Sequence, residues 1–538
     1  MANARLTAIE IERFKSYRKR TRVEFAPLTV LLGRNNSGKS TLIQALLLLK
    51  QTLALPRPEV PLHLEGMVDA LSLRELTSGW PEGPEIQGPS FSLEWTSTVD
   101  IDAALEQARS PDLAELRGNT GLEWLMDAAT PKFRSVTTRL TLEYAESNGK
   151  TILKSILLAS LQENSKPSFF IGRHQESGQY ACFWHSKGWS QYQHASKLSV
   201  ELEHFLPYLL IERRNVGPRD RQRSWHNAFL LLFAQPLEDL KALLTGFSYL
   251  GSIRTLPPSL YRPATVPPEE IGISGEYAAQ MLHARRADAV HYLPPLHLKD
   301  DQVVIPDTIR ESALVDGVND VLRALGVDTS LEVEEVRDVG FRLLFGRANL
   351  QHVGRGLSYL LPVIQLGLIS DPLRFKTTGP LDLETYREKC PSYGHCAFEE
   401  PEAHLHPKVQ TRLAHWLVAL AMARRQLLVE THSDHLVRRL RGLIARAGAG
   451  SELERWLLEN IRVLQVEQTG GESEVQVARL TTRGGLEEWP SDFMDEATGE
   501  ERSIYHAALD KPEETMAVEA PPPDEAPVEH DVGEEPEP

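Results

Sequence analysis

The spacing of apolar positions near the start of the chain predicts strands. Residues 6–11 form a β-rich run, residues 14–18 form a turn, and residues 23–32 lead into a continuous apolar stretch. Short apolar runs bounded by turn residues are typical of strands. Similar β-like runs follow at residues 90–95 and 139–144, so several strands are expected in the first part of the chain.

A helix is expected directly after the apolar stretch. Leu42 and Leu46 belong to a strongly apolar segment with helical spacing, which should end before Pro56 because proline cannot continue a helix. A weaker helical pattern lies near residues 103–109. Together with the strands, these helices predict a mixed α/β first lobe over residues 1–163.

The segment 164–245 differs in character from its surroundings. Aromatic and polar side chains come first, and helical patterns follow at residues 202–210 and 229–244. We therefore expect an α-rich insertion that contacts a partner or nucleic acid. Strand and helix signals then resume and predict a second lobe over residues 246–509. The sequence shows no internal repeat and no sustained heptad, which argues against a long coiled-coil arm.

The composition changes again at residues 510–538. This segment holds eleven acidic residues against one Lys, seven prolines and few bulky apolar side chains. Such a segment cannot bury enough apolar surface to offset the entropy of ordering, so we expect a disordered acidic tail. Because the tail carries most of the net charge of −17, the body of this 538-residue chain is nearly neutral and has room only for a local basic face.

Cysteine content and the length of apolar runs indicate the compartment. Three cysteines are too few for a disulfide framework, and they suit a reducing environment. The N-terminus lacks the apolar core of a signal peptide, and no run reaches the roughly 18 apolar residues that a membrane helix needs. We expect a cytoplasmic protein without membrane contact.

The strongest chemical signal is the segment GRNNSGKST at residues 33–41. It matches the phosphate-binding pattern G-x-x-x-x-G-K-S and lies between an expected strand and an expected helix, which is the context that this motif needs. Backbone N–H groups would surround phosphate oxygens, Lys39 would contact the β- and γ-phosphates, and the Ser40 hydroxyl would ligate Mg²⁺. We therefore expect ATP and Mg²⁺ as ligands. The expected contacts are Gly33, Asn35, Asn36, Ser37, Gly38, Lys39, Ser40 and Thr41.

Two adjacent acids end a short apolar run at residues 396–398. Glu399 and Glu400 follow this run directly, and Pro401 comes next. Since adjacent residues on a strand point to opposite sides, Glu399 would face the metal and Glu400 would face the γ-phosphate and orient the attacking water. Taken alone, Glu-Glu-Pro also fits an exposed acidic loop.

A histidine follows a second apolar strand at residues 427–429. In parallel α/β sheets ligands bind at the carboxyl ends of strands, and His432 stands near this end. A neutral His432 could hydrogen-bond the γ-phosphate or the water and thereby sense that phosphate. The alternative is a purely structural histidine.

The order of these motifs resembles the ABC-type ATPase heads of the SMC/RecF-like group. The segment EEPEAHLHP at residues 399–407 is similar to a motif of the AAA15/AAA21-like and OLD-like ATPases of bacterial phage-defence loci. YLGSIR at 249–254, GISGEY at 272–277 and WPSDFMD at 489–495 look like segments of standalone ATPases in that group. The resemblance implies a P-loop ABC-type head with two lobes, and it leaves out the insertion and the tail.

Heads of this type need a signature segment that caps the ATP of a partner head. The candidate is VGRGLSYLLP at residues 353–362, in which glycines permit close approach and Ser358 can donate to the γ-phosphate near a helix N-terminus. Tyr359 departs from the family, where Gln commonly follows the serine, and the L-S-G-G core of transporter heads is absent. The glutamine of the loop that normally links the two lobes cannot be identified.

Two further clusters have competing interpretations. His395, His404 and His406, together with Glu402, could form a metal site, but the resemblance places them at a dimer-contacting loop. Five arginines within residues 213–223 lie beside Trp225 and could contact nucleic acid, or they could form a solvated, salt-bridged face.

The resemblance implies an ATPase that binds and slowly hydrolyses ATP and closes head to head as a homodimer or higher oligomer. No D-x-D pair of the kind used by TOPRIM nucleases follows His432. The expected partner is therefore a separately encoded nuclease or toxin in anti-phage defence or DNA maintenance, with DNA as a further candidate. A RecF/SMC-like repair ATPase and an ATP-stabilised scaffold with negligible turnover remain as alternatives.

Overall fold

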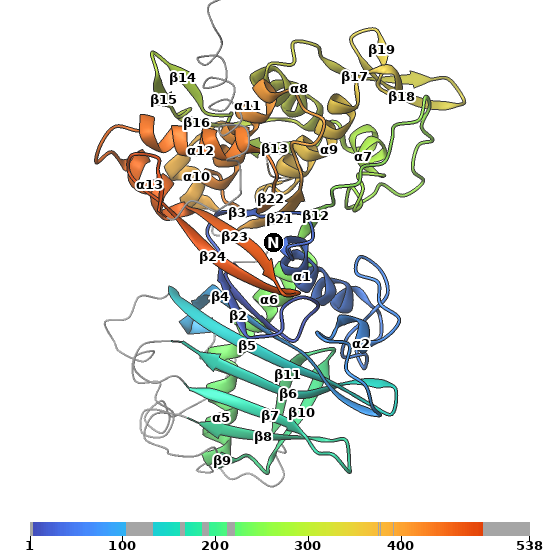
Figure 1. Cartoon of the computed structure of the whole chain (residues 1–538), viewed down its shortest axis with the longest axis vertical. Coiled ribbons are helices and arrows are strands. Elements are labelled where there is room, and N and C mark those ends of the chain that lie inside the picture. Colours follow the sequence, from blue (N-terminus) through green and yellow to red (C-terminus); the bar gives the residue numbers. More distant parts are fainter. Residues whose placement is uncertain are drawn as a thin grey trace, which may run out of the picture. The chain divides into compact units, whose positions relative to one another are not determined.

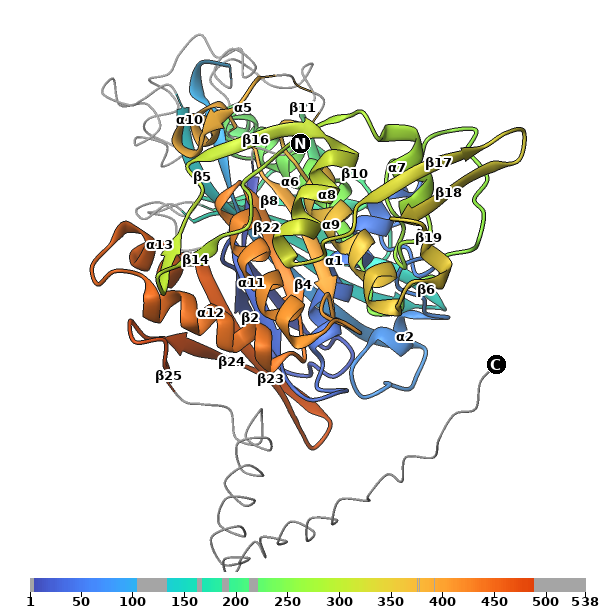
Figure 2. The ribbon, with the colours of Figure 1, turned by 90° about the horizontal axis from the view of Figure 1, so that it is seen from above.

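Two large sheets organise the part of the chain that the structure describes (Figures 1 and 2). The structure is a computed structural model, and it describes residues 4–103, 133–161, 167–185, 193–211, 221–374, 376, 378–390 and 392–487. One sheet is mostly parallel, and the other is antiparallel. The expected mixed α/β class is confirmed.

The mostly parallel sheet carries the motifs singled out above. Its strands, in spatial order, are β12 (Ser248–Leu250), β21 (Gly394–Glu399), β22 (Arg425–Glu430), β3 (Leu28–Leu32), β23 (Ile461–Thr469), β24 (Glu472–Leu480) and β25 (Leu486–Glu487). The first five strands pair in parallel, and every residue of β3, β21 and β22 is buried, as expected for a sheet covered on both faces. The carboxyl ends of these strands therefore lie along one edge.

Helices cover both faces of this parallel sheet (Figure 1). α1 (Lys39–Ala54) contacts β22 and packs on α6 (Gln235–Thr245), which also contacts the antiparallel sheet. α11 (Pro407–Met422) contacts β22 and β3, and α9 (Arg355–Ile369) contacts β21. The helix expected before Pro56 is confirmed, since α1 ends at Ala54.

Within the described residues, the antiparallel sheet has eight strands. In spatial order they are β2 (Thr21–Glu24), β1 (Ala4–Glu12), β4 (Glu85–Asp100), β5 (Phe133–Ser147), β6 (Lys150–Ser160), β7 (Ser168–Arg173), β8 (Tyr180–His185) and β9 (Gln193–His194). Hence β7, β8 and β9, which lie in the expected insertion, extend the sheet of the first lobe. Buried Phe169 and Trp184 of these strands belong to the same apolar core as α1.

A β-hairpin replaces the helix expected at residues 202–210. β10 (Leu198–Glu203) pairs with β11 (Leu206–Ile211), so that prediction is wrong. Leucines at three- and four-residue spacings suggested a helix, but the chain turns at His204, whose φ is +58°. The backbone N–H of His204 donates to the carbonyl of Pro58 at 2.6 Å, which anchors the turn. The spacing of apolar residues across the turn therefore reflects two short strands.

Helices do occupy the second half of the expected insertion. α5 (Arg221–Phe229) continues through a π-helical stretch (Leu230–Ala234) into α6, which confirms the helix expected at residues 229–244. The described part of residues 164–245 is thus strand-rich first and helical afterwards, and the expected α-rich character holds only for its second half. Its role as a contact for partners remains a prediction.

Smaller elements complete the second lobe. The short sheets are β13 (Ala289–Tyr292), β16 (Thr308–Ala313) and β20 (Leu381–Asp382); β14 (His297–Lys299) and β15 (Gln302–Val304); and β17 (Leu331–Val336), β18 (Gly340–Phe345) and β19 (Ala348–Asn349). Its remaining helices within the described ranges are α7 (Ala278–Arg285), α8 (Leu314–Leu325), α10 (Leu383–Lys389), α12 (Asp434–Arg446), α13 (Glu452–Asn460) and a 3-10 turn (Leu350–His352), whereas α2 (Leu73–Leu76) belongs to the first lobe. Figure 2 shows α8 beside α9, which it contacts.

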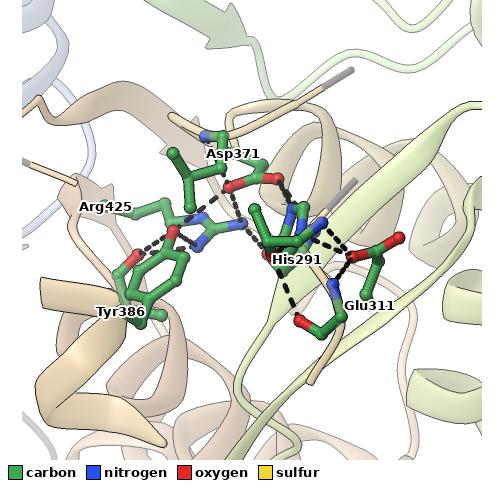
Figure 3. Close-up of polar contacts among 9 residues, drawn as sticks. His291, Glu311, Asp371, Tyr386 and Arg425 are labelled. Atoms are coloured by element: carbon green, nitrogen blue, oxygen red, sulfur yellow. Dashed lines mark hydrogen bonds and ion pairs between the residues drawn. The ribbon is translucent and has the colours of Figure 1, made fainter. Parts of the chain in front are cut away.

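A buried polar network connects residues of β13, β16, α10 and β22 with Asp371, which follows α9 (Figure 3). Nδ1 of His291 lies 3.0 Å from Asp371, and its Nε2 lies 3.2 Å from Glu311. Tyr386 donates to Asp371 at 3.1 Å, and Arg425 pairs with the same carboxylate at 3.5 Å. Asp371 follows α9 and Arg425 begins β22, so the network fixes the end of one element against the start of the other.

Several expectations lie outside the described residues. These are the tail at residues 510–538, the segment 489–495 and all but the first residue of the weak helical pattern at 103–109. Within the described ranges, none of the helices combines the length and the apolar character needed to cross a membrane.

Candidate functional site

The phosphate-loop motif forms a tight turn between β3 and α1. Gly33 has φ +150°, and a Cβ there would lie 2.2 Å from the carbonyl oxygen of Val466 on β23. Gly38 has φ +104° directly before α1, and a Cβ there would lie 2.4 Å from Oγ of Ser473. Both positions therefore require glycine, and the loop can form only because neither residue carries a side chain.

Two segments that sequence reasoning did not connect with this site brace the loop. Tyr17 donates from its hydroxyl to the carbonyl of Gly38 at 3.1 Å. Ser473, at the start of β24, donates to the carbonyl of Ser37 at 2.5 Å, and its backbone N–H donates to Ser16 at 2.9 Å. The sequence showed a turn at residues 14–18, but nothing in it indicated that this turn meets β24.

The motif residues expected to contact phosphate all lie in this loop or in the first turn of α1. Asn35 and Asn36 are exposed, Asn36 has φ +64°, and Thr41 is buried. Lys39 is 3% exposed, and its Nζ donates to the carbonyl oxygens of Gly33 at 3.1 Å and Arg34 at 2.8 Å. The ammonium group therefore lies over the loop itself, where a bound phosphate chain would accept its hydrogen bonds.

Ser40 has an unexpected partner. Its hydroxyl donates to Oε2 of Glu430 at 2.8 Å, and Oε1 of Glu430 lies 3.6 Å from Nζ of Lys39. Glu430 ends β22, which runs between β21 and β3, so its carboxylate reaches the phosphate loop directly. Burial raises the pKa of Glu430, whereas Ser40 and Lys39 oppose this shift. Sequence reasoning missed Glu430; its position at the end of an apolar strand was the available signal.

Glu399 lies one strand further along, in register with Glu430. Burial and the nearby Glu430 carboxylate together raise the pKa of Glu399 to about 7, although a hydrogen bond from Tyr249 opposes the shift. Within the described residues, Oε1 of Glu399 has no hydrogen-bond partner. Two neighbouring buried carboxylates, one with an unpaired oxygen, are suited to a cation.

Glu400 adopts a left-handed backbone conformation, with φ +46°. Its backbone N–H donates to the carbonyl of Glu430 at 2.8 Å. The strand ends at Glu399, so Glu400 lies in a turn, and strand alternation does not set the direction of its side chain. Burial lowers the pKa of Lys39, while Glu430, Glu400 and Glu399 all oppose that shift, so all three carboxylates act on this lysine.

His432 lies close to the same groups. Burial lowers its pKa, Lys39 lowers it further, and Glu400 raises it. Its backbone N–H donates at 2.9 Å to Oε1 of Glu402, which also accepts from the hydroxyl of Thr431 at 2.6 Å. Glu402 thus anchors the strand end that presents His432, a role that sequence reasoning did not assign.

The signature candidate forms the start of α9. Ser358 lies in its first turn and is buried. A Cβ at Gly356 would lie 2.7 Å from the carbonyl of His404, and the Tyr359 ring packs edge-on against the His404 ring at 4.9 Å. The first turn of α9 therefore contacts the loop that follows Glu402. The action of Ser358 on a partner's nucleotide remains a prediction.

His395 and His406, the other two histidines of the candidate metal cluster, have structural surroundings of their own. Burial lowers the pKa of His395 to about 3, and His406 caps α11 by accepting from the N–H of Lys408. In the described part of the chain, no group of three or more His, Cys, Asp or Glu side chains is arranged to hold a metal by itself. A magnesium ion held by Ser40 and one or two carboxylates would complete its coordination with phosphate oxygens and water.

The arginine cluster is only partly described. Arg221 and Arg223 begin α5, whereas residues 212–220 lie outside the described ranges. Trp225 is 5% exposed, so its buried ring is not available to stack on a base.

Part of this chain matches the model of a known protein family. Residues 5–97 and 381–437 match AAA_15, an AAA ATPase domain. These two segments contain the phosphate loop, the Glu399–Glu400 pair, Glu430 and His432. No curated protein matches the chain.

Solved structures of SMC heads show a distant likeness. An SMC head bound to the C-terminal winged-helix domain of ScpA has 12% identity and a TM-score of 0.37, with 88% of this chain and 98% of that chain covered. The SMC head domain of Thermotoga maritima has 10% identity and a TM-score of 0.32, with 88% and 100% covered. A head with an extended coiled coil, bound to the C-terminal domain of ScpA from Pyrococcus furiosus, has 11% identity and a TM-score of 0.34, with 93% and 100% covered.

Proposed function

We propose that this chain, an ATPase of the AAA_15 type, binds ATP with Mg²⁺ at the phosphate loop and hydrolyses it. One observation carries the proposal: Lys39, Ser40, Glu399, Glu400 and Glu430 come from three separate segments and gather at the carboxyl ends of β3, β21 and β22. Ligands of parallel α/β sheets bind at these ends.

Each residue of this site has a proposed role in nucleotide binding or hydrolysis. Lys39 and the backbone of the loop would hold the β- and γ-phosphates, because the ammonium group already lies over the loop. Ser40 with Glu399 or Glu430 would hold Mg²⁺, which neutralises charge on the phosphates when bound. Glu400 would orient the attacking water, and His432 would contact the γ-phosphate.

We further propose that two copies close head to head on ATP, with Ser358 capping the nucleotide of the partner head. The contact of α9 with the loop after Glu402 supports this, since it links the signature helix to the strand ends that carry the acids. Closure and release would switch a separately encoded nuclease or toxin in anti-phage defence or DNA maintenance, in keeping with the resemblance of the motifs.

Phosphate release separates this function from an ATP-stabilised scaffold. The wild-type chain should release phosphate steadily, whereas Glu400→Gln should keep nucleotide binding, lose turnover by about 100-fold or more, and give a more dimeric complex with ATP. The matched control is Glu459→Gln, at an exposed position on α13. Equal low rates for wild type and Glu400→Gln would favour the scaffold. Stimulation of hydrolysis by added DNA would favour the repair ATPase.

A further inference from the structure

The peptide bond between Glu399 and Glu400 is held from both sides. Its carbonyl oxygen accepts a hydrogen bond from Nη2 of Arg254 at 2.9 Å. Its N–H donates to the carbonyl of Glu430 at 2.8 Å. Glu400 has φ +46°, a conformation that costs side-chain-bearing residues about 1–3 kcal/mol, and these two contacts help to hold the peptide in it.

Arg254 is a buried cation with spare hydrogen-bonding capacity. Only 5% of the residue is exposed, and within the described residues its Nη1 has no partner. A buried, incompletely paired guanidinium destabilises a fold, so its presence at this position points to a functional role. The carboxylates of Glu399 and Glu400 both act on the Arg254 guanidinium, which also supplies the donor for the carbonyl of the Glu399–Glu400 peptide.

The segment that carries Arg254 connects the acids to the signature helix. β12 pairs in parallel with β21, with Leu250 opposite Phe398, so the residues after both strands lie side by side. The loop at residues 251–277 then returns, and a Cβ at Gly275 would lie 3.0 Å from Pro362 of α9. The loop thus contacts the Glu399–Glu400 peptide at one end and α9 at the other.

We propose that Arg254 is the positioning residue for Glu400, and that the loop at residues 251–277 links the position of α9 to that of Glu400. This proposal rests on the proposed ATPase function. In ATPase heads that this sequence resembles, a loop with a glutamine normally links the two lobes, and no such glutamine could be identified in the sequence. The proposal assigns this linking role to the loop at residues 251–277. When α9 moves on closure, the loop would bring the guanidinium, and with it the Glu399–Glu400 peptide, into the geometry that hydrolysis needs.

The test combines single and double variants in the full chain. Arg254→Ala should lower kcat by about 100-fold, because a misplacement of about 1 Å at a catalytic group has this effect, while the Kd for a fluorescent ATP analogue changes less than about threefold. Arg254→Lys keeps one donor and should lose about tenfold, which gives a second variant if the alanine change impairs folding. Arg262→Ala, an exposed arginine of the same loop, is the control and should behave as wild type.

The double variant shows whether Arg254 acts through Glu400. If it does, Arg254→Ala combined with Glu400→Gln should be no slower than Glu400→Gln alone. Methylguanidine should partly restore kcat of Arg254→Ala and leave Arg262→Ala unchanged. Two results would overturn this proposal alone, provided that the wild-type chain hydrolyses ATP. One is an unaltered kcat for Arg254→Ala, and the other is additive losses in the double variant. A wild-type chain without phosphate release would overturn it together with the proposed function.

Discussion

The hydroxyl of Ser40 donates a hydrogen bond to Oε2 of Glu430 at 2.8 Å, although 390 positions separate the two residues. This contact exists because β22 pairs in parallel with β3, which brings the last residue of β22 beside the loop that follows β3. Glu430 also lies 3.6 Å from Lys39. One carboxylate therefore contacts both side chains on which the phosphate-loop chemistry depends.

Glu430→Gln tests whether this carboxylate supports Mg²⁺. We expect the Mg²⁺ concentration that gives half-maximal binding of a fluorescent ATP analogue to rise by about tenfold, because groups that orient metal ligands typically contribute that much to metal affinity. The control is Glu474→Gln, at an exposed position on β24. An unchanged Mg²⁺ dependence would show that Glu430 has no part in holding the cation.

Gly33→Ala tests the close approach of the loop to β23. The new Cβ would lie 2.2 Å from a backbone carbonyl, which cannot move without distorting the strand. We expect a lowered Tm and loss of nucleotide binding. Gly79→Ala is the control, since Gly79 also has positive φ, at +80°, but a Cβ there would meet no atom within 4 Å. Equal effects of the two changes on Tm would mean that backbone strain, and not the collision with β23, is responsible.

The buried network of Figure 3 predicts a large loss of stability for Asp371→Asn. This change leaves the fully buried Arg425 without its carboxylate partner, which costs about 3–5 kcal/mol at comparable sites. Glu334→Gln breaks the partly exposed pair with Arg342 and should cost about 0–1 kcal/mol. Urea unfolding of both variants gives the comparison, and similar midpoints would contradict the importance of the network.

His395 predicts a dependence of stability on pH. Its pKa is about 3 in the folded chain because burial disfavours the charged form, whereas an exposed histidine titrates near pH 6.5. The unfolded chain therefore binds more protons between these values. The contribution of His395 is fully present above pH 6.5 and is lost as the pH falls towards 3.

His395→Asn should reduce this dependence. Between pH 7.5 and 5.5, the free energy of unfolding should fall by about 1.4 kcal/mol less in the variant than in the wild type, as expected for one group across one pH unit below its unfolded pKa. His297→Asn, at an exposed position, is the control. Identical pH profiles for wild type and His395→Asn would contradict the assignment.

Local patterns predicted the parts of the site that depend on short segments. The phosphate loop, the strand that ends at Glu399 and the helix that ends before Pro56 follow from spacing and from residue type. Glu430 and Ser473 could not be found this way, because their roles depend on which strands become neighbours. The hairpin at His204 shows the converse, since apolar spacing across an unrecognised turn produced a false helix.

The backbone conformation of Glu400 could not be predicted from the sequence either. Strand alternation alone would have sent Glu399 and Glu400 to opposite faces, but the chain leaves the strand between them and enters a left-handed turn. The carbonyl of Glu399 before this turn accepts from Arg254, whose segment pairs with β21 only in the folded chain. The sequence therefore indicated the acids but not the contacts that orient them.

Whether these distant segments form one nucleotide site is tested best with Lys39→Ala. The measurement is the equilibrium binding of a fluorescent ATP analogue in the presence of Mg²⁺. We expect the Kd to rise by about 100-fold relative to the wild type, because a buried charged contact to the phosphates is removed. The control Lys408→Ala, at an exposed position on α11, should keep the wild-type Kd. An unchanged Kd for Lys39→Ala would contradict the account.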